Sequence, residues 1–214
     1  LGIGQLQSVI GYSYGGHLAY LWSGTYPDRM RSVVTIAGRM RRTTTMEDIQ
    51  EIRDWFEERC SGWNGGFYYG REKSGGVHDA LIEYRIERLR KYGVGDWLEA
   101  TVPDPAERDR ILRRRAETWA GQFDANSLWL LYRAGIGSDA RPLAENMRAP
   151  LLKVLADTDS VAPFDEGQET VDFLKSHGVD ARFLPLQTPY GHAGPMLEAG
   201  KWSADLASFL DETS

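Results

Sequence analysis

The chain of 214 residues has a single cysteine, no excess of basic charge and no long apolar run. Because Cys60 is alone, an internal disulfide and a cysteine-rich metal site are excluded. The 25 lysine and arginine residues stand against 31 aspartate and glutamate residues, and the net charge of −6 argues against a nucleic-acid partner, which needs a basic face. No apolar run reaches the roughly 18 residues of a membrane span, and no secretory leader is recognisable. We therefore expect a cytoplasmic protein that binds neither nucleic acid nor membranes.

The rest of the composition is that of an ordinary globular protein, with 42% hydrophobic and 26% charged residues. Four short apolar runs near the two ends are expected to form strands, at residues 7–12, 32–38, 149–157 and 180–187. Helical patterns lie between and after them, over 15–26, over 163–178 with its end at Gly178, and over about 201–210. This alternation predicts an α/β fold, with a parallel sheet covered by helices on both faces.

The middle of the chain has a different pattern. From 42 to 135 we find polar helical sequences and no convincing strand. The first helical sequence, over 43–59, opens with a threonine cap and carries Glu47 in its first turn. We expect a helical lid insertion at 42–135, between residues 1–41 and 136–214, which form the two parts of one core.

The stretch Gly-Tyr-Ser-Tyr-Gly-Gly, residues 11–16, lies between the first expected strand and the first expected helix. A sharp strand-to-helix turn at this point would expose the hydroxyl of Ser13 as a nucleophile. The strained backbone of such a turn needs neighbours with little side chain, and Gly11 and Gly15 occupy the two expected positions. The backbone N–H of Tyr14 would then begin a helix and point to the place where an oxyanion forms.

A nucleophile of this kind needs an acid and a base later in the chain, in the order serine, acid, histidine. The acid should follow the third expected strand, and the pattern of an acid, three residues and a proline favours Asp159, with Pro163, while Asp157 stays open. The base should follow the last strand, where His192 lies in a Gly-His loop. We therefore predict that Ser13, Asp159 and His192 form a catalytic triad that acts through an acyl-enzyme.

Three stretches give the chain a family resemblance. They are residues 1–38 around the serine, Gly-Trp-Asn-Gly-Gly-Phe-Tyr at 62–68 and Phe-Asp-Ala-Asn-Ser at 123–127, the most specific of the three. Together they resemble the α/β-hydrolase superfamily, and within it the homoserine O-acetyltransferase-like branch. The resemblance covers most of the chain, implies a serine hydrolase or acyltransferase, and agrees with the predicted triad.

Two features depart from that branch. Its acetyltransferases carry an aspartate after the base which, as the resemblance implies, holds the amino group of homoserine, whereas here the residue is Ala193. A charged hydrogen bond of this kind in a closed site contributes on the order of 1.5–3 kcal/mol. Tyr12 and Tyr14 also replace the small residue and the methionine that are usual around the serine. We therefore expect an esterase acting on acetyl or small acyl esters, with an O-acetyltransferase using an acyl-CoA donor as the alternative and a non-catalytic binding scaffold as the third hypothesis.

The resemblance also has consequences for the sheet. It implies eight strands with residues 7–12 as the fifth, so that four strands and a second oxyanion N–H are expected to be missing from this sequence. Val9 and Ile10 would then lie on an unpaired apolar edge, which predicts a second chain, either a complementary N-terminal fragment or a homo-oligomer partner. We expect no metal and no cofactor, since no two histidines lie at ligand spacing, and acetyl-CoA would enter only as the co-substrate of a transfer reaction.

Overall fold

Two segments that are distant in the sequence, Leu1–Arg41 and Asp139–Ser214, form one unit of the structure, and Arg42–Ser138 forms another. The computed structural model describes residues 2–70 and 75–214. The second unit begins at the residue where the helical insertion is expected to begin, and it ends at Ser138 rather than at 135.

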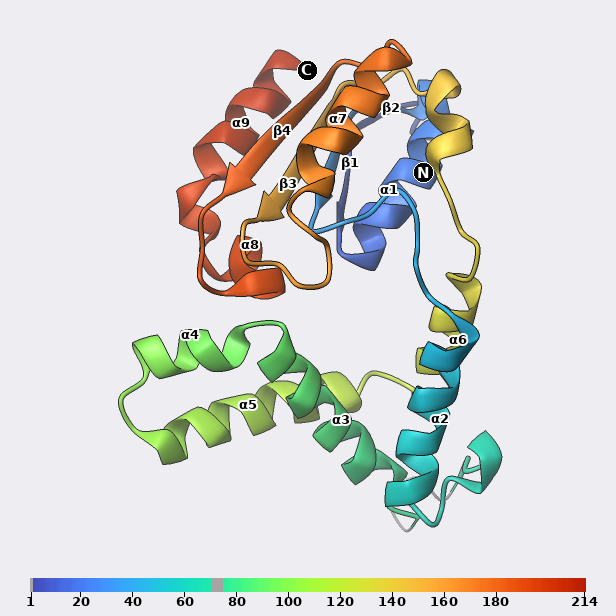
Figure 1. The fold of residues 1–214 in the computed structure, drawn as a ribbon, viewed down its shortest axis with the longest axis vertical. Coiled ribbons are helices and arrows are strands. Elements are labelled where there is room, and N and C mark those ends of the chain that lie inside the picture. Colours follow the sequence, from blue (N-terminus) through green and yellow to red (C-terminus); the bar gives the residue numbers. More distant parts are fainter. Residues whose placement is uncertain (1, 71–74) are drawn as a thin grey trace. The chain divides into compact units, whose positions relative to one another are not determined.

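The first unit contains a four-stranded parallel sheet in the order β1-β2-β3-β4 (Figure 1). Its strands are β1 (Leu6–Tyr12), β2 (Met30–Ile36), β3 (Leu151–Ala156) and β4 (Ala181–Leu186). They form where the apolar runs predict them, and the expected parallel α/β sheet is confirmed. Every residue of β3 is buried, because this inner strand is covered on both faces.

Helices cover both faces of this sheet (Figure 1). The helices of the first unit are α1 (Tyr14–Thr25), α7 (Glu166–Ser176), α8 (Gly194–Leu197) and α9 (Ser203–Glu212). Tyr20 of α1 and Leu174 of α7 belong to the core on one face, together with Val33. Phe209 of α9 belongs to the core on the other face, together with Val34. Neighbouring residues of a strand point to opposite faces, so a sheet covered twice requires the continuous apolar runs seen in the sequence.

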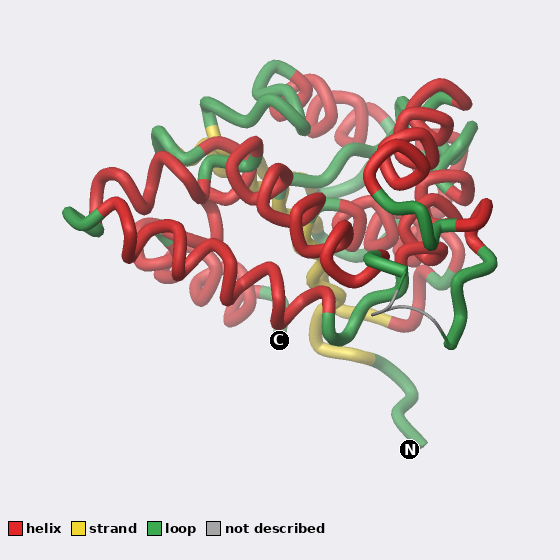
Figure 2. The backbone as a smooth tube through the Cα atoms, turned by 90° about the horizontal axis from the view of Figure 1, so that it is seen from below, coloured by secondary structure: helices red, strands yellow, loops and turns green. Residues whose placement is uncertain are grey.

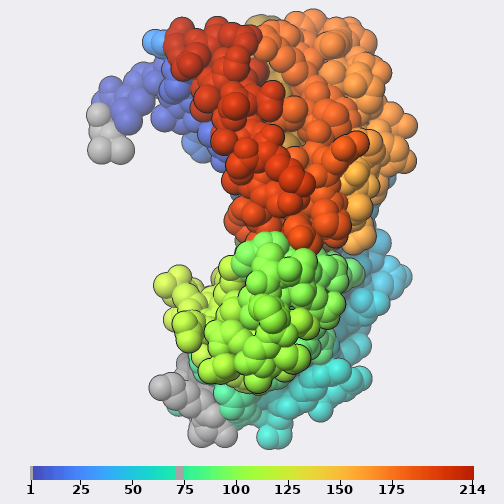
Figure 3. Space-filling view, turned by 90° about the vertical axis from the view of Figure 1, so that its left-hand side faces the viewer, coloured from blue at the N-terminus to red at the C-terminus, as the bar shows by residue number. Residues whose placement is uncertain are grey.

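Strand β1 is the outer strand of the described sheet, and part of its surface is exposed. Leu6 is 37% and Ile10 is 50% accessible. The strand is attached to α9 through Gln7, whose side-chain amide donates to the carbonyl oxygen of Leu210 at 3.1 Å. Figure 3 shows the blue start of the chain at the surface beside the red helix α9. An outer strand with exposed apolar side chains can pair with a further strand.

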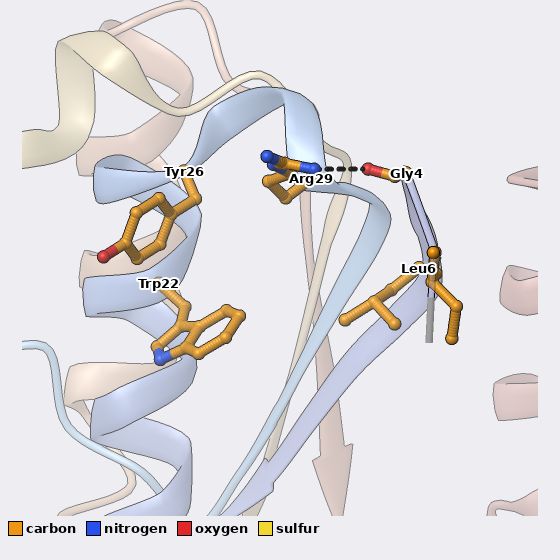
Figure 4. A pocket seen from close by; sticks show the side chains of 7 residues that line it. Gly4, Leu6, Trp22, Tyr26 and Arg29 are labelled. Atoms are coloured by element: carbon orange, nitrogen blue, oxygen red, sulfur yellow. Dashed lines mark hydrogen bonds between the residues drawn. The ribbon is translucent and has the colours of Figure 1, made fainter.

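A pocket of about 490 Å³ lies at the start of β1, where the strand faces α1 (Figure 4). Leu6 lines it from the strand, and Trp22 and Tyr26 line it from the helix, with their ring centroids 5.4 Å apart. Arg29 donates a hydrogen bond to the carbonyl oxygen of Gly4 at 3.2 Å. The exposed edge of β1 therefore continues into an apolar surface on α1.

Helices joined by loops make up the described part of the second unit, and they appear in red in Figure 2. They are α2 (Met46–Arg59), α3 (Val77–Lys91), α4 (Val94–Thr101), α5 (Pro105–Ala120) and α6 (Ala125–Ala134). Thr45 caps α2 as expected, in a reciprocal box with Asp48. The helical sequences at 78–93 and 104–120 correspond to α3 and α5, whereas the sequence patterns single out neither α4 nor α6. Among all described residues, no helix is both long enough and apolar enough to cross a membrane.

The two motif segments of the second unit are hydrogen-bonded to each other. The side-chain amide of Asn126 donates to the carbonyl oxygen of Gly66 at 2.6 Å. The hydroxyl of Tyr68 donates to the carboxylate of Asp124, which also caps α6 by accepting the N–H of Ser127 at 2.7 Å. Both motifs therefore contribute hydrogen bonds to one contact inside this unit.

Candidate active site

Ser13 lies at the turn between β1 and α1, where the sequence predicts the nucleophile. Its φ of 55° and ψ of −115° are strained for a residue with a side chain. The turn is held by a hydrogen bond from the Ser13 N–H to the carbonyl oxygen of Ile36, at 2.8 Å. Gly11 makes this path possible, since a Cβ atom on it would lie 2.0 Å from the carbonyl oxygen of Gly15.

The second position of this turn that requires glycine is Gly16, and the expectation for Gly15 is wrong. A Cβ atom on Gly15 would meet nothing within 4 Å. A Cβ atom on Gly16 would lie 2.9 Å from the Cα atom of Gly38, a residue in the loop after β2. Position 16 therefore needs glycine because the backbone of α1 packs closely against the loop that contains Gly38, and not because of the bend at Ser13.

The three predicted triad residues are hydrogen-bonded in series. The Nε2 atom of His192 lies 2.8 Å from the Oγ atom of Ser13, and its Nδ1 atom lies 2.8 Å from Oδ2 of Asp159. The side chain of His192 is 3% accessible and that of Asp159 is fully buried. An imidazole with its proton on Nδ1, toward the carboxylate, leaves Nε2 free of a proton and able to accept the one on the serine hydroxyl.

The structure distinguishes the two candidate acids by their partners. Asp159 presents Oδ2 to the imidazole, while its Oδ1 accepts the backbone N–H groups of Val161 at 2.7 Å and Ala162 at 3.0 Å. Asp157 instead accepts the N–H of Thr188 at 2.9 Å. Asp159 is thus the carboxylate in contact with the base, and two backbone donors fix how it is turned.

Tyr14 is the first residue of α1. The amino end of a helix favours negative charge, because the N–H groups of the first turn point out of it. The backbone N–H of Tyr14 therefore stands next to the nucleophile in an environment that suits an oxyanion. Its role as an oxyanion donor stays a prediction.

None of the other three histidines belongs to this series, and two of them pair with backbone carbonyl oxygens. The Nδ1 atom of His17 pairs with the carbonyl oxygen of Arg39 at 3.0 Å, and that of His177 pairs with the carbonyl oxygen of Phe173 at 2.8 Å. His78 lies in α3 of the second unit. Within the part of the chain that the structure describes, no group of three or more histidine, cysteine, aspartate or glutamate side chains is arranged to hold a metal ion.

One residue of the site carried no signal in the sequence. The hydroxyl of Thr158 donates to the carbonyl oxygen of Thr188 at 2.6 Å and accepts the N–H of Gly191 at 3.0 Å. It therefore joins the loop that carries Asp159 to the loop that carries His192. The one indication of this role in the sequence is that Thr158 directly precedes the predicted acid, Asp159.

A buried lysine contacts the loop that packs on the turn. Lys153 of β3 is 0% accessible, and its ammonium group donates to the carbonyl oxygen of Gly38 at 2.9 Å and to the hydroxyl of Tyr20 at 3.4 Å. The pKa of Lys153 is lowered from its ordinary 10.5 to about 8, mainly by burial and in smaller part by the positive charge of Arg39, while the negative charge of Glu166 opposes the shift.

This lowered pKa predicts a stability that rises with pH. Between pH 8 and 10.5 the unfolded chain keeps the proton of Lys153 and the folded chain has lost it, so the free energy of unfolding should increase by up to about 3 kcal/mol. Lys153→Met should remove this rise, whereas Lys175→Met, at an exposed lysine, should keep it. Denaturant unfolding at pH 7, 8, 9 and 10 measures the difference. Equal pH dependence in both variants would contradict the assignment.

Comparison with known proteins shows to which family this fold belongs. The profile described as the alpha/beta hydrolase fold matches residues 1–163, which is most of the chain. The chain belongs to the α/β-hydrolase superfamily. The family that the three stretches of sequence indicate is thereby confirmed, together with its fold.

Individual α/β-hydrolases resemble the chain over nearly all of its length. The homoserine O-acetyltransferase of Carboxydothermus hydrogenoformans is 28% identical over 231 residues, which cover 99% of this chain and 61% of that protein. The chain is thus similar to the homoserine O-acetyltransferases of this superfamily. It spans less than two thirds of that relative, and 47% of the homoserine O-acetyltransferase of Methanobrevibacter ruminantium, which is 25% identical.

Solved structures show the same fold. The homoserine O-acetyltransferase from Bacillus anthracis superposes with a TM-score of 0.76 at 19% identity, over 98% of this chain and 61% of that one. An acetylester hydrolase from Corynebacterium glutamicum superposes with a TM-score of 0.75 at 18% identity, over 100% of this chain and 62% of that one. The fold is thus shared with a protein named as a transferase and with one named as an ester hydrolase.

Proposed function

We propose that the chain carries the acyl-transfer machinery of a serine esterase that acts on acetyl or other small acyl esters. The observation that carries the proposal is the continuous series of two 2.8 Å hydrogen bonds from Ser13 through His192 to Asp159. Buried groups arranged in this order activate a hydroxyl that is otherwise a weak nucleophile. The names of the relatives support acyl transfer as the reaction class.

In this mechanism Nε2 of His192 takes the proton of Ser13 while Oγ attacks the ester carbonyl carbon. The negative charge that develops on the carbonyl oxygen is stabilised by the N–H of Tyr14 at the start of α1. The imidazolium is held by Asp159 and then protonates the leaving alcohol. Water, activated by the same imidazole, finally releases the acid from the acyl-enzyme. No step needs a cofactor.

O-acetyl transfer is the alternative, and the names of the relatives favour it. The acceptor would then replace water at the acyl-enzyme, and acetyl-CoA would be the acyl donor. Against homoserine as acceptor stands Ala193, which follows the base and is 3% accessible. A buried methyl group offers no counter-charge to the ammonium group of homoserine.

A small fluorophosphonate tests the proposal. One phosphonyl adduct should form on the intact chain and map to the peptide that contains Ser13, and Ser13→Ala serves as the blank. Release of acetate from 4-nitrophenyl acetate should be unaffected by added homoserine. Formation of O-acetylhomoserine would establish the transferase, while a folded chain that takes up no adduct would mean that this chain by itself is not a working serine enzyme.

We further propose that a polypeptide pairs with the free edge of β1 and supplies a second oxyanion donor. The exposed Ile10 on this strand and the greater length of the relatives support this partner. A complementary fragment would add a second polypeptide mass to the denaturing spectrum of the purified protein. A second copy of the chain would instead double the native mass.

A further inference from the structure

The turn that carries His192 is hydrogen-bonded to the segments that carry Asp159 and Ser13. In each case the side chain that makes the bond belongs to the residue just before the triad member. Thr158, which precedes the acid, accepts the N–H of Gly191 at 3.0 Å. Tyr12, which precedes the nucleophile, donates its hydroxyl hydrogen to the carbonyl oxygen of His192. The backbone of the base is therefore held by side chains from the strand ends that carry its two partners.

Tyr12 is placed for this contact by the sheet. It is the last residue of β1, where it pairs with Ile36 of β2, and it is half-buried. Its ring packs against the core that includes Trp202. The ring centroid lies 5.5 Å from that of the His192 imidazole, with the two planes inclined at 51°. The packing of its ring and the pairing of its backbone with β2 together direct the Tyr12 hydroxyl to the turn that carries His192.

We propose that Tyr12 is a positioning residue for the base, so that two consecutive residues hold one histidine. Ser13 contacts its ring at Nε2, and Tyr12 holds its main chain at the carbonyl oxygen. The distance between nucleophile and base is then set by the short path through residues 12 and 13. The proposal rests on the proposed function, since it assigns Tyr12 a part in the same reaction.

The hydroxyl, and not the ring, carries this role. Phenylalanine at position 12 would keep the packing against the core and the contact with the imidazole, and it would lose only the hydrogen bond. The turn could then shift, and misplacement of a catalytic group by about 1 Å can cost up to ~100-fold in rate. Tyr190→Phe is the matched control, because it removes a phenol hydroxyl two residues from His192 without touching the carbonyl that Tyr12 holds.

The test compares wild type, Tyr12→Phe and Tyr190→Phe in turnover of 4-nitrophenyl acetate and in phosphonylation of Ser13. For Tyr12→Phe we expect kcat and the phosphonylation rate to fall about 10-fold or more, with KM and Tm unchanged. Tyr190→Phe should match wild type. A positioning role predicts this split, because substrate binding does not depend on where the base lies.

The outcomes separate the inference from the function on which it rests. A wild-type chain without turnover or adduct would refute the proposed function itself. An active wild type with an equally active Tyr12→Phe variant would overturn the inference. A variant that loses kcat together with several degrees of Tm, or that fails to fold, would also overturn it, since Tyr12 would then stabilise the fold rather than position the base.

Discussion

Replacing Asp159 by asparagine should lower kcat by about 10³–10⁴-fold, because it forces the wrong tautomer on the base. The backbone N–H groups of Val161 and Ala162 both point at Oδ1, so they fix an asparagine with its carbonyl oxygen in that position. The amide NH₂ then faces His192 and donates to Nδ1. The remaining proton of the imidazole must lie on Nε2, which can no longer accept the proton of Ser13.

Asp157→Asn is the matched control for this experiment. Asp157 is two residues away, and its Oδ1 accepts the N–H of Thr188, a task that the carbonyl oxygen of asparagine performs equally well. Turnover should stay within about 3-fold of wild type, with a similar Tm. A larger loss in Asp157→Asn than in Asp159→Asn, measured with 4-nitrophenyl acetate, would reverse the assignment of the acid.

The parts of the fold that could be predicted are those that depend on a local sequence pattern, such as a run of apolar residues. The runs that contain Val33, Val34 and the residues of β3 are continuous and apolar because helices cover both faces of the sheet. The order of serine, acid and histidine followed from the turn at Ser13 and from the strands after which Asp159 and His192 stand. Local pattern was sufficient in each case.

The parts that could not be predicted depend on contacts between distant residues. Gly16 needs to be glycine because Gly38 packs on it, and the local turn pattern pointed to Gly15 instead. The choice between the two aspartates depends on which of them reaches His192, and their spacing in the sequence left that open. Tyr12 drew attention only as a departure from the family, and its contact spans 180 positions along the chain.

The two unpredicted helices have different explanations. Helix α6 begins with an aspartate cap at Asp124, a local signal that lies within the stretch Phe-Asp-Ala-Asn-Ser of the family resemblance. Helix α4 has eight residues and contains Gly95, so neither its length nor its composition marks it as a helix. Packing within the second unit stabilises it, since Leu98 is fully buried there.

Two glycines of the nucleophile motif, Gly11 and Gly15, should respond very differently to replacement by alanine. In Gly11→Ala the new Cβ atom would lie 2.0 Å from the carbonyl oxygen of Gly15, 2.3 Å from its carbonyl carbon and 2.7 Å from the nitrogen of Gly16. All three are backbone atoms of the turn, so no side-chain rotation can relieve the clash. We expect a loss of more than about 3 kcal/mol in the free energy of unfolding, and at least ~100-fold slower phosphonylation of Ser13 in whatever folds.

Gly15→Ala should have almost no cost, although the nucleophile motif contains both glycines. Its Cβ atom would enter open space, and alanine favours the helical backbone of α1 over glycine by up to about 1 kcal/mol. Denaturant unfolding and the rate of phosphonylation, measured side by side, check both variants. If Gly11→Ala folded and reacted like wild type, the strained path of the chain through Ser13 would be wrong. If Gly15→Ala were equally damaging, the motif would require both glycines for a reason other than space, and the requirement would lie in the flexibility of the turn.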